Sequence, residues 1–280
     1  MSNTIVYAED WAVKIQERLA EPNKWKIICR VEYTDMAVLH NPYETDATVQ
    51  SGTRGTAYTM QDIVTTDENI AINTFKILPQ IIDRADLAQT TYVSQMQKAG
   101  SQGVLLNEAI ETAVFADYAS MTTFDNTKIG GAAGNITVSA ANVDDIIRGI
   151  KREVRIANGE SVAEREGYFI VWRPADFELL EAFVQANGFS TADGALKDGT
   201  SQGFNYMNVQ HFSSNKLTAG HLIAGVKNCY HLGIVKSTYG QIVVTQDPLN
   251  VSGIGVISRV DFKGKVWHNV KPILFNVTVA

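Results

Sequence analysis

The most regular hydrophobic pattern of the chain is a helical period over residues 86–121. In this window small and apolar side chains return every three or four positions, as one face of an α-helix requires. Proline is absent from residues 80–173, so no proline interrupts the pattern. The window therefore predicts a helix of about 30 residues, roughly 45 Å long at about 1.5 Å per residue. Gly100 and Gly103 weaken a helix interior, so two helices with a joint at 100–103 are the alternative.

Three shorter segments also have the pattern of amphipathic helices. Residues 9–20 place apolar side chains four positions apart, and a proline follows. Residues 143–157 begin with two aspartates and end with basic side chains, as the helix dipole favours, and an Asn-Gly pair follows as a stop signal. Another helix starts at Pro174 and ends at the Asn-Gly pair 187–188. The glycines of residues 188–203 predict a loop.

Runs of β-branched and aromatic residues predict strands elsewhere. Two runs within residues 26–40 end at the Asn-Pro pair 41–42, and the apolar run Tyr168–Trp172 has the composition of a buried strand. The remaining predicted strands are 206–212, 221–226, 241–245, 255–260, 265–270 and 273–279. Strands and helices are mixed without a regular βαβ alternation, so the predicted fold class is α+β.

The composition changes between residues 45 and 74. This stretch is rich in Thr, Gly, Asp and Asn, and its apolar residues are widely spaced. Two β-like arms, 56–64 and 70–78, flank a polar tip at 65–69, which predicts a long two-stranded hairpin. A lone two-stranded ribbon is only marginally stable in water. A hairpin this poor in apolar residues therefore needs a partner outside itself.

Composition and charge narrow the possible function classes. Apolar residues make up 45% of the 280 positions, enough for a sizeable core and too many for intrinsic disorder. The chain carries 24 basic and 30 acidic residues, a net charge of −6, without a basic block, which disfavours tight binding to nucleic acid. Cys29 and Cys229, without a CxxC motif, are typical of a reduced, cytosolic protein. Neither a secretory signal nor a membrane-spanning apolar run is present, so no membrane partner is expected.

A search for reactive constellations yields no candidate. His211, His221 and His231 lack the HExxH or paired-cysteine context of a zinc site and are interpreted as ordinary core or surface histidines. The SSNK run at 213–216 lacks the companion motifs of serine acyltransferases, and no glycine-rich phosphate loop or GxSxG elbow occurs. The scattered carboxylates are interpreted as parts of solvated faces; they include Asp62, Asp67, Glu68, Glu108, Glu111 and Asp117. No catalytic residue, cofactor or metal site is predicted, and the chain is expected not to be an enzyme.

The order of these segments resembles the major capsid proteins of tailed bacteriophages, which have the Hong Kong-type shell fold. The segment IAINTFKILPQIIDRADLAQTTY is similar to the family's return strand and the start of its spine helix, here about 86–121. YFIVWRP with the following helix, and AGHLIAGVKNCYHLG, are similar to parts of its axial domain, and FKGKVWHNVKPILFNVTV to its final strands. The resemblance covers nearly the whole chain. It implies an N-terminal arm 1–44, an extended loop 45–78, a peripheral domain 79–141 with the spine helix, an axial domain 142–245, and a return to the peripheral domain over 246–280.

The resemblance implies a structural function. Family subunits form pentamers and hexamers that tile an icosahedral head around double-stranded DNA, so the main expected partner is many copies of this chain. A separate scaffolding protein (or none), a portal protein and decoration proteins are the other expected partners, and DNA contacts are expected to be weak because the chain is acidic. The expected location is the virion, after assembly in the host bacterial cytoplasm. Some family members cross-link subunits through a lysine of the loop, but residues 44–75 contain no lysine, so no cross-link is expected.

In the family the extended loop lies over the spine helix of a neighbouring subunit, which supplies the partner that the polar hairpin lacks. Such head-to-tail contacts close into rings when the rotation between copies allows it. The residues expected to form charge pairs between subunits are Arg54, Asp62, Asp67 and Glu68. Two alternatives stay open: an encapsulin-type nanocompartment shell that houses an enzyme, and a soluble α+β enzyme whose site has no local sequence signature.

Overall fold

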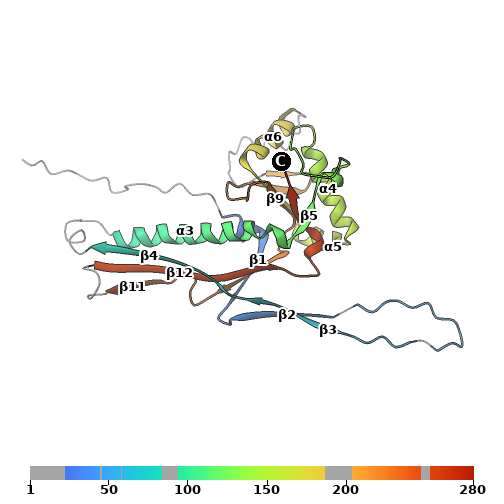
Figure 1. Ribbon diagram of the computed structural model, residues 1–280, viewed down its shortest axis with the longest axis horizontal. Coiled ribbons are helices and arrows are strands. Elements are labelled where there is room, and N and C mark those ends of the chain that lie inside the picture. Colours follow the sequence, from blue (N-terminus) through green and yellow to red (C-terminus); the bar gives the residue numbers. More distant parts are fainter. Residues whose placement is uncertain (1–22, 45, 58, 84–93, 187–203, 247–252) are drawn as a thin grey trace, which may run out of the picture.

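The computed structural model describes residues 23–44, 46–57, 59–83, 94–186, 204–246 and 253–280. Two β-sheets form the body, a long helix lies along one of them, and a hairpin projects from the body (Figure 1). The helix predicted over 9–20 and the loop predicted over 188–203 lie outside the described residues. Within those described segments, no helix is both long and apolar enough to cross a membrane.

The first sheet has five strands and carries the long helix α3 (Ser94–Ala116) on one face. Its strands are β1 (Cys29–Thr34), β10 (Tyr230–Val235), β12 (Gly253–Val266), β11 (Ile242–Gln246) and β4 (Thr74–Asp83). The long strand β12 pairs with β10, β11 and β4. The buried hydroxyl of Ser258 on β12 donates a hydrogen bond to the side-chain oxygen of Gln102 on α3. The core between helix and sheet includes Trp25, Phe115, Val260 and Phe262.

The second sheet has six strands and helices packed around it (Figure 1). In order across the sheet, its strands are β5 (Thr122–Phe124), β13 (Leu274–Thr278), β9 (His221–Val226), β6 (Tyr168–Trp172), β8 (Val209–Ser213) and β7 (Phe204–Tyr206). The helices are α4 (Val143–Ile156), α5 (Glu160–Glu166) and α6 (Pro174–Ala186). Strand β6 is buried along its whole length, as its uninterrupted apolar sequence predicts.

The hairpin consists of β2 (Val38–Glu44) and β3 (Thr65–Ala71), which pair in antiparallel register with Glu44 opposite Thr65. The described residues of the connecting segment 46–64 form no helix or strand, and all of them are exposed. Figure 1 shows the hairpin and this segment extending away from the two sheets. The chain therefore has a long polar projection with little packing of its own, as the sequence predicts.

The long helix is confirmed over its described part, and the alternative of two helices is wrong. α3 runs without a break from Ser94 through Gly100 and Gly103 to Ala116. Packing against the sheet outweighs the intrinsic cost of the two glycines. The helix ends earlier than predicted, and the 3-10 turn Tyr118–Ser120 follows it. The predicted helices at 143–157 and from Pro174 are also confirmed.

The predicted position of the hairpin tip is wrong. Residues 65–69, predicted as the tip, belong to strand β3, and the described residues of 56–64, predicted as a strand, do not form one. The partner of β3 is β2, which continues through Pro42 to Glu44 instead of ending at the proline. A proline lacks the N–H for a ladder bond but is tolerated on an edge strand, and β2 has only β3 as a neighbour in its two-stranded sheet.

Several strand predictions in the second half of the chain need correction. The strand β12 contains all of the predicted strand 255–260 but only the first two residues of 265–270, whose remainder forms no strand. The segment 206–212 contains the end of β7, a turn and most of β8. The turn residues Met207 and Asn208 have φ of 54° and 60°, as a tight hairpin turn requires. The pattern predicts neither β10 nor the short helices α1 (Trp25–Ile28) and α5.

Each of the two sheets draws strands from more than one of the segments 1–44, 45–78, 79–141, 142–245 and 246–280. β10 lies in the predicted axial domain 142–245 but joins the first sheet. β13 lies in the predicted return segment 246–280 but joins the second sheet, beside β9. The roles of these segments as arm, loop, peripheral domain and axial domain of a shell subunit stay predictions.

Candidate assembly surfaces

The segment between β2 and β3 (residues 46–64, called here the loop) carries apolar side chains in solvent. It turns at Gly55, whose φ is +89°, beside a hydrogen bond of 3.1 Å from Thr56 N to Thr53 O. The exposed large apolar side chains of the loop are Val49, Met60, Ile63 and Val64. Val49 is 96% exposed and Met60 86%. Their concentration on one unsupported segment is typical of a surface that another molecule covers.

Polar contacts hold the base of the hairpin to its own chain. Asp67 Oδ2 lies 2.7 Å from His40 Nδ1 on the paired strand. Glu68 forms an ion pair of 3.3 Å with Lys265 Nζ and accepts a hydrogen bond of 2.9 Å from the His268 backbone N–H. Two of the four residues predicted to form charge pairs between subunits therefore have partners within the chain.

The other two predicted residues, Arg54 and Asp62, lie in the loop and are exposed. In the part of the chain that the structure describes, neither forms an ion pair. Both side chains are therefore placed where a second molecule could meet them. The role of all four residues between subunits stays a prediction.

A second exposed apolar surface, called here the outer face, lies on the five-stranded sheet opposite α3. Alternate residues of a strand point to opposite faces, and Ser258 of β12 points to α3. Residues directly paired between β12 and its neighbours β4 and β11 lie on the same face of the sheet. Residues of β12 an odd number of positions from Ser258, together with their partners on β4 and β11, therefore point away from the helix. The large apolar ones, each more than half exposed, are Phe75, Ile77, Ile81 and Val243. Arg259, on the same face, lies 5.2 Å from the Phe75 ring centroid.

Figure 1 shows the loop and the strands that carry the outer face extending in opposite directions from the base of the hairpin. The loop extends to the right, whereas β4, β11 and the start of β12 extend to the left. The loop of one chain therefore cannot cover the outer face of the same chain.

A buried polar cluster joins three parts of the chain in the C-terminal third of α3. The Glu111 carboxylate accepts hydrogen bonds from the backbone N–H of Lys24 at 2.6 Å and of Trp25 at 3.5 Å, and from the Ser214 hydroxyl at 3.5 Å. Glu111 and Ser214 are fully buried. The cluster thus connects α1, α3 and the segment after β8, and ties the second sheet to the helix that lies on the first.

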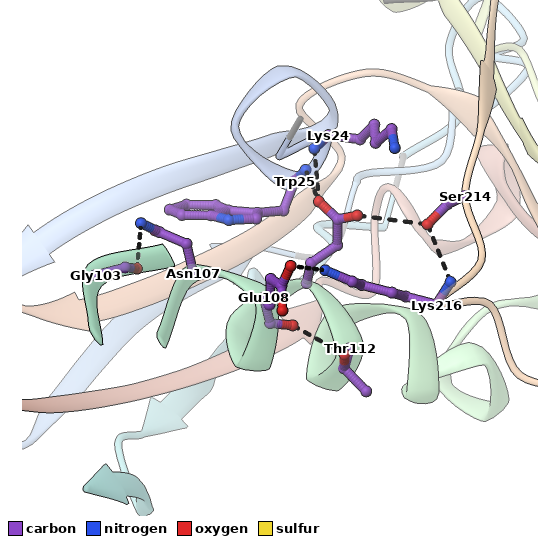
Figure 2. Close-up of polar contacts among 9 residues, drawn as sticks. Lys24, Trp25, Gly103, Asn107, Glu108, Thr112, Ser214 and Lys216 are labelled. Carbon is purple, nitrogen blue, oxygen red and sulfur yellow. Dashed lines mark hydrogen bonds and ion pairs between the residues drawn. The ribbon is translucent and has the colours of Figure 1, made fainter. Parts of the chain in front are cut away.

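Further polar contacts surround this cluster (Figure 2). Lys216 Nζ forms an ion pair of 3.2 Å with Glu108 Oε1, and the Lys216 backbone N–H donates to the Ser214 hydroxyl. Burial raises the pKa of Glu111, while the hydrogen bonds from Lys24 and Trp25 act in the opposite direction. The interpretation of Glu111 as part of a solvated face is wrong, because its donors lie far away in the sequence and leave no local signal.

His211 is a fully buried member of the second sheet. Trp172 Nε1 donates a hydrogen bond of 3.0 Å to His211 Nδ1, and His211 Nε2 donates to the Tyr206 carbonyl at 3.3 Å. The neutral imidazole satisfies both contacts, whereas a second ring proton would face the indole N–H. Burial lowers the pKa of His211 to about 4.

We expect acid to destabilise the fold through His211. The pKa of His211 is about 4 in the fold, whereas its ordinary value is 6.5. The contribution of the neutral ring to the unfolding free energy is therefore complete above pH 6.5 and is lost as the pH falls toward 4. Linkage gives a loss of about 2 kcal/mol of unfolding free energy between about pH 7 and about pH 4.5, which urea denaturation measures. His211→Gln, which does not titrate, should lose less stability over this interval. An equal loss in the variant contradicts the role of this residue.

The two cysteines are buried, and burial raises the pKa of both thiols, that of Cys229 to about 12. Their thiolates therefore do not form near neutral pH. Among the residues that the structure describes, no group of three or more His, Cys, Asp and Glu side chains could hold a metal ion.

Comparisons with known proteins agree on the fold. No family model matches the chain, and no curated protein matches it. A solved structure from Mycobacterium phage Che8 is 17% identical, with 98% of each chain covered and a TM-score of 0.70. The capsid of an empty GTA particle is 14% identical, with 98% of this chain and 95% of that chain covered and a TM-score of 0.73. A virus-like particle from Pyrococcus furiosus is 11% identical, with 92% of each chain covered and a TM-score of 0.59.

At these identities the similarity shows the fold. The chain has the α+β, Hong Kong-type fold of phage capsid proteins, as the sequence resemblance implies.

Proposed function

We propose that this chain is the major shell subunit of a tailed-phage head and assembles into pentamers and hexamers around double-stranded DNA. The fold supports the proposal, because similarity to structures named as capsids extends over nearly the whole chain. The nanocompartment shell is the second candidate, since the Pyrococcus furiosus virus-like particle also has this fold. An enzyme is not favoured by any of the similar structures reported above.

The observation that carries the proposal is the separation of the two apolar surfaces. The loop and the strands of the outer face extend in opposite directions from the base of the hairpin, so copies arranged head to tail can cover both surfaces at once. Complete burial of a side chain of this size contributes about 1.5–3 kcal/mol. Partial burial of several such side chains gives each contact between two subunits a small free energy, and the contact is repeated around every ring.

The remaining partners belong to the same proposal. A separate scaffolding protein directs the curvature of the shell, a portal protein occupies one vertex, and decoration proteins bind outside. DNA is enclosed with weak contacts, because the chain has a net charge of −6. The shell assembles in the host cytoplasm and ends in the virion.

The function is tested by expressing the full chain with and without candidate scaffolding proteins and examining the product by velocity sedimentation and electron microscopy. We expect closed particles or rings of five and six copies. Their contents separate the two shell hypotheses, because DNA or scaffold supports the phage head and a cargo enzyme supports the nanocompartment. A small oligomer that turns over a metabolite contradicts both.

We expect shells of this protein to dissociate to single chains in hot detergent. Residues 44–75 contain no lysine, and the arginine at position 54 cannot replace it because a guanidinium is too weak a nucleophile to form an isopeptide bond. Denaturing gel electrophoresis of purified shells measures the outcome. A ladder of covalent oligomers contradicts the prediction.

Reversing the charge at Arg54 is expected to lower the yield of shells by a few-fold and to leave the subunit folded. Exposed ion pairs contribute only about 0–1 kcal/mol each, but the contact is repeated in every subunit. Particle yield by sedimentation is the measurement for Arg54→Glu, with Arg54→Gln as the control that removes the charge without reversing it. A yield of Arg54→Glu equal to that of the original chain removes this residue from the contact.

A further inference from the structure

A cavity of about 610 Å³ opens where α1, β1, α5 and the turn between β9 and β10 meet. The cationic side chains in its lining are Lys26, Arg30, Arg165 and Lys227, and Glu166 is the acidic one. Four positive charges against one negative leave an excess of three on a chain whose net charge is −6. Such a local inversion of charge attracts anions.

Glu166 is already engaged and does not neutralise the cavity. Its carboxylate lies 2.7 Å from Arg165 Nε and accepts a hydrogen bond of 2.6 Å from Asn228 Nδ2. These hydrogen bonds lower the pKa of Glu166, so it stays ionised and compensates Arg165. The positive charges of Lys26, Arg30 and Lys227 remain.

Lys227 is the member of the set that most needs an anion. It is half-buried, and its ammonium donates to the neutral side-chain oxygen of Gln210. Across the described ranges, no carboxylate lies within ion-pair distance of it. A cation removed from water destabilises the fold unless it is paired, and burial accordingly lowers the pKa of Lys227.

Arg30, on β1, is a second cationic residue of the lining and carries a forked guanidinium donor. Its Nε lies 3.6 Å from Glu32, and both side chains of this pair are largely exposed, so the pair is weak. The field of Arg30 also reaches His231 in the lining, where burial and this charge lower the pKa to about 4. His231 is therefore neutral near pH 7 and adds no positive charge to the cavity.

We propose that this cavity binds a phosphate-type oxyanion between Arg30 and Lys227. A guanidinium offers two parallel donors to a phosphate and an ammonium offers a point charge, and the amides of Asn228 and Asn269 also line the space. The volume is in the range of small-molecule sites and exceeds what a bare phosphate fills. Free phosphate and the phosphodiester of a nucleic acid both present this oxyanion, and only the second brings neighbouring groups that could fill the remaining volume. The proposal does not depend on shell assembly.

The test is titration of sodium phosphate into the full chain at constant ionic strength, with chloride as the balancing ion. We expect a saturable rise in the Tm and saturable broadening of the phosphorus NMR line. Lys227→Met should weaken phosphate binding by about 10-fold or more, as loss of a charge-assisted contact does. The matched control, Lys76→Met, removes the same charge from an exposed position outside the lining and should bind phosphate unchanged.

Arg30→Gln keeps the test decisive if Lys227→Met does not fold, because the Arg30 side chain is 62% exposed and carries little packing. Titration with a short single-stranded DNA distinguishes the two sources of the oxyanion, free phosphate and the phosphodiester of a nucleic acid. Tighter binding of DNA that displaces phosphate assigns the site to nucleic acid, and binding of phosphate alone assigns it to the free ion. The proposal is overturned by a response that does not saturate, by equal losses in Lys227→Met and Lys76→Met, or by binding of a glutamate-rich peptide without binding of phosphate.

Discussion

Replacing residues 45–64, which include the whole loop, by a two-residue Asn-Gly turn is expected to abolish shell assembly and to leave the subunit folded. The junction is compatible with the fold, because Glu44 and Thr65 are opposite each other in the register of β2 and β3 and a two-residue turn closes such a pair. Loss of even two apolar contacts removes about 3 kcal/mol from each contact between subunits, or roughly 100-fold in its equilibrium constant. Velocity sedimentation should show only small species.

The control for this deletion keeps the loop at full length and replaces its exposed apolar side chains by serine. The substituted positions are Val49, Met60, Ile63 and Val64. We expect the same loss of assembly, because the contact depends on these side chains and not on the length of the segment. The deletion should raise the unfolding free energy by up to about 2 kcal/mol, because closing a connection about ten times shorter costs less entropy. The serine variant should change it by less than about 1 kcal/mol, because the replaced side chains are exposed. Normal shells from either variant exclude the loop as an assembly surface.

Glu111→Leu is expected to destabilise the subunit by about 2–4 kcal/mol, the largest effect expected from a single substitution. The leucine leaves the Lys24 backbone N–H and the Ser214 hydroxyl without their acceptor, and each buried unsatisfied group costs about 1–3 kcal/mol. Chemical denaturation measures the loss. Assembly should fail as well, because the cluster holds the second sheet against α3.

Glu111→Gln is the matched control, because its amide oxygen can still accept from Lys24 and its amide nitrogen can donate to Ser214. We expect it to lie within about 1 kcal/mol of the original chain. The pKa of Glu111 is raised in the fold above its ordinary value of 4.5. The contribution of this carboxyl to the unfolding free energy is therefore complete below pH 4.5 and is lost as the pH rises through the pKa of the folded state. Glu111→Gln should therefore gain stability relative to the original chain as the pH rises. An equal loss in Gln and Leu variants contradicts the hydrogen-bonding role.

Local sequence patterns predict the elements that depend on their own side chains. The periodic residues of α3 and α4, the apolar run of β6 and the proline that starts α6 each fix an element whose buried face is visible in its own sequence. The polar loop is predicted for the same reason, because its composition cannot form a core.

Long-range pairing is what the patterns miss. Thr65–Ala71 has the composition of a turn, and it becomes a strand because β2 pairs with it. β10 joins the first sheet and β13 the second, and local patterns do not predict this because the neighbours of each strand are far away in the chain. Register and sheet membership are set by such tertiary contacts, and strand propensity depends on them more than helix propensity does.

The candidate surfaces are predicted in part. The need of the loop for an outside partner follows from composition, and so does the exposure of Arg54 and Asp62. The outer face cannot be predicted in the same way, because Phe75, Ile77 and Ile81 alternate as any half-buried strand would. Only the side on which α3 packs decides that they point to solvent.

Hydrogen–deuterium exchange of residues 46–64, compared between assembled and dissociated protein, tests the central claim most directly. The claim is that a second copy holds the loop. We expect its amides to exchange at nearly the rate of an unstructured peptide in single chains, and at least about 100-fold more slowly in the assembly. Slow exchange in the single chain, or equally fast exchange in both states, contradicts the claim.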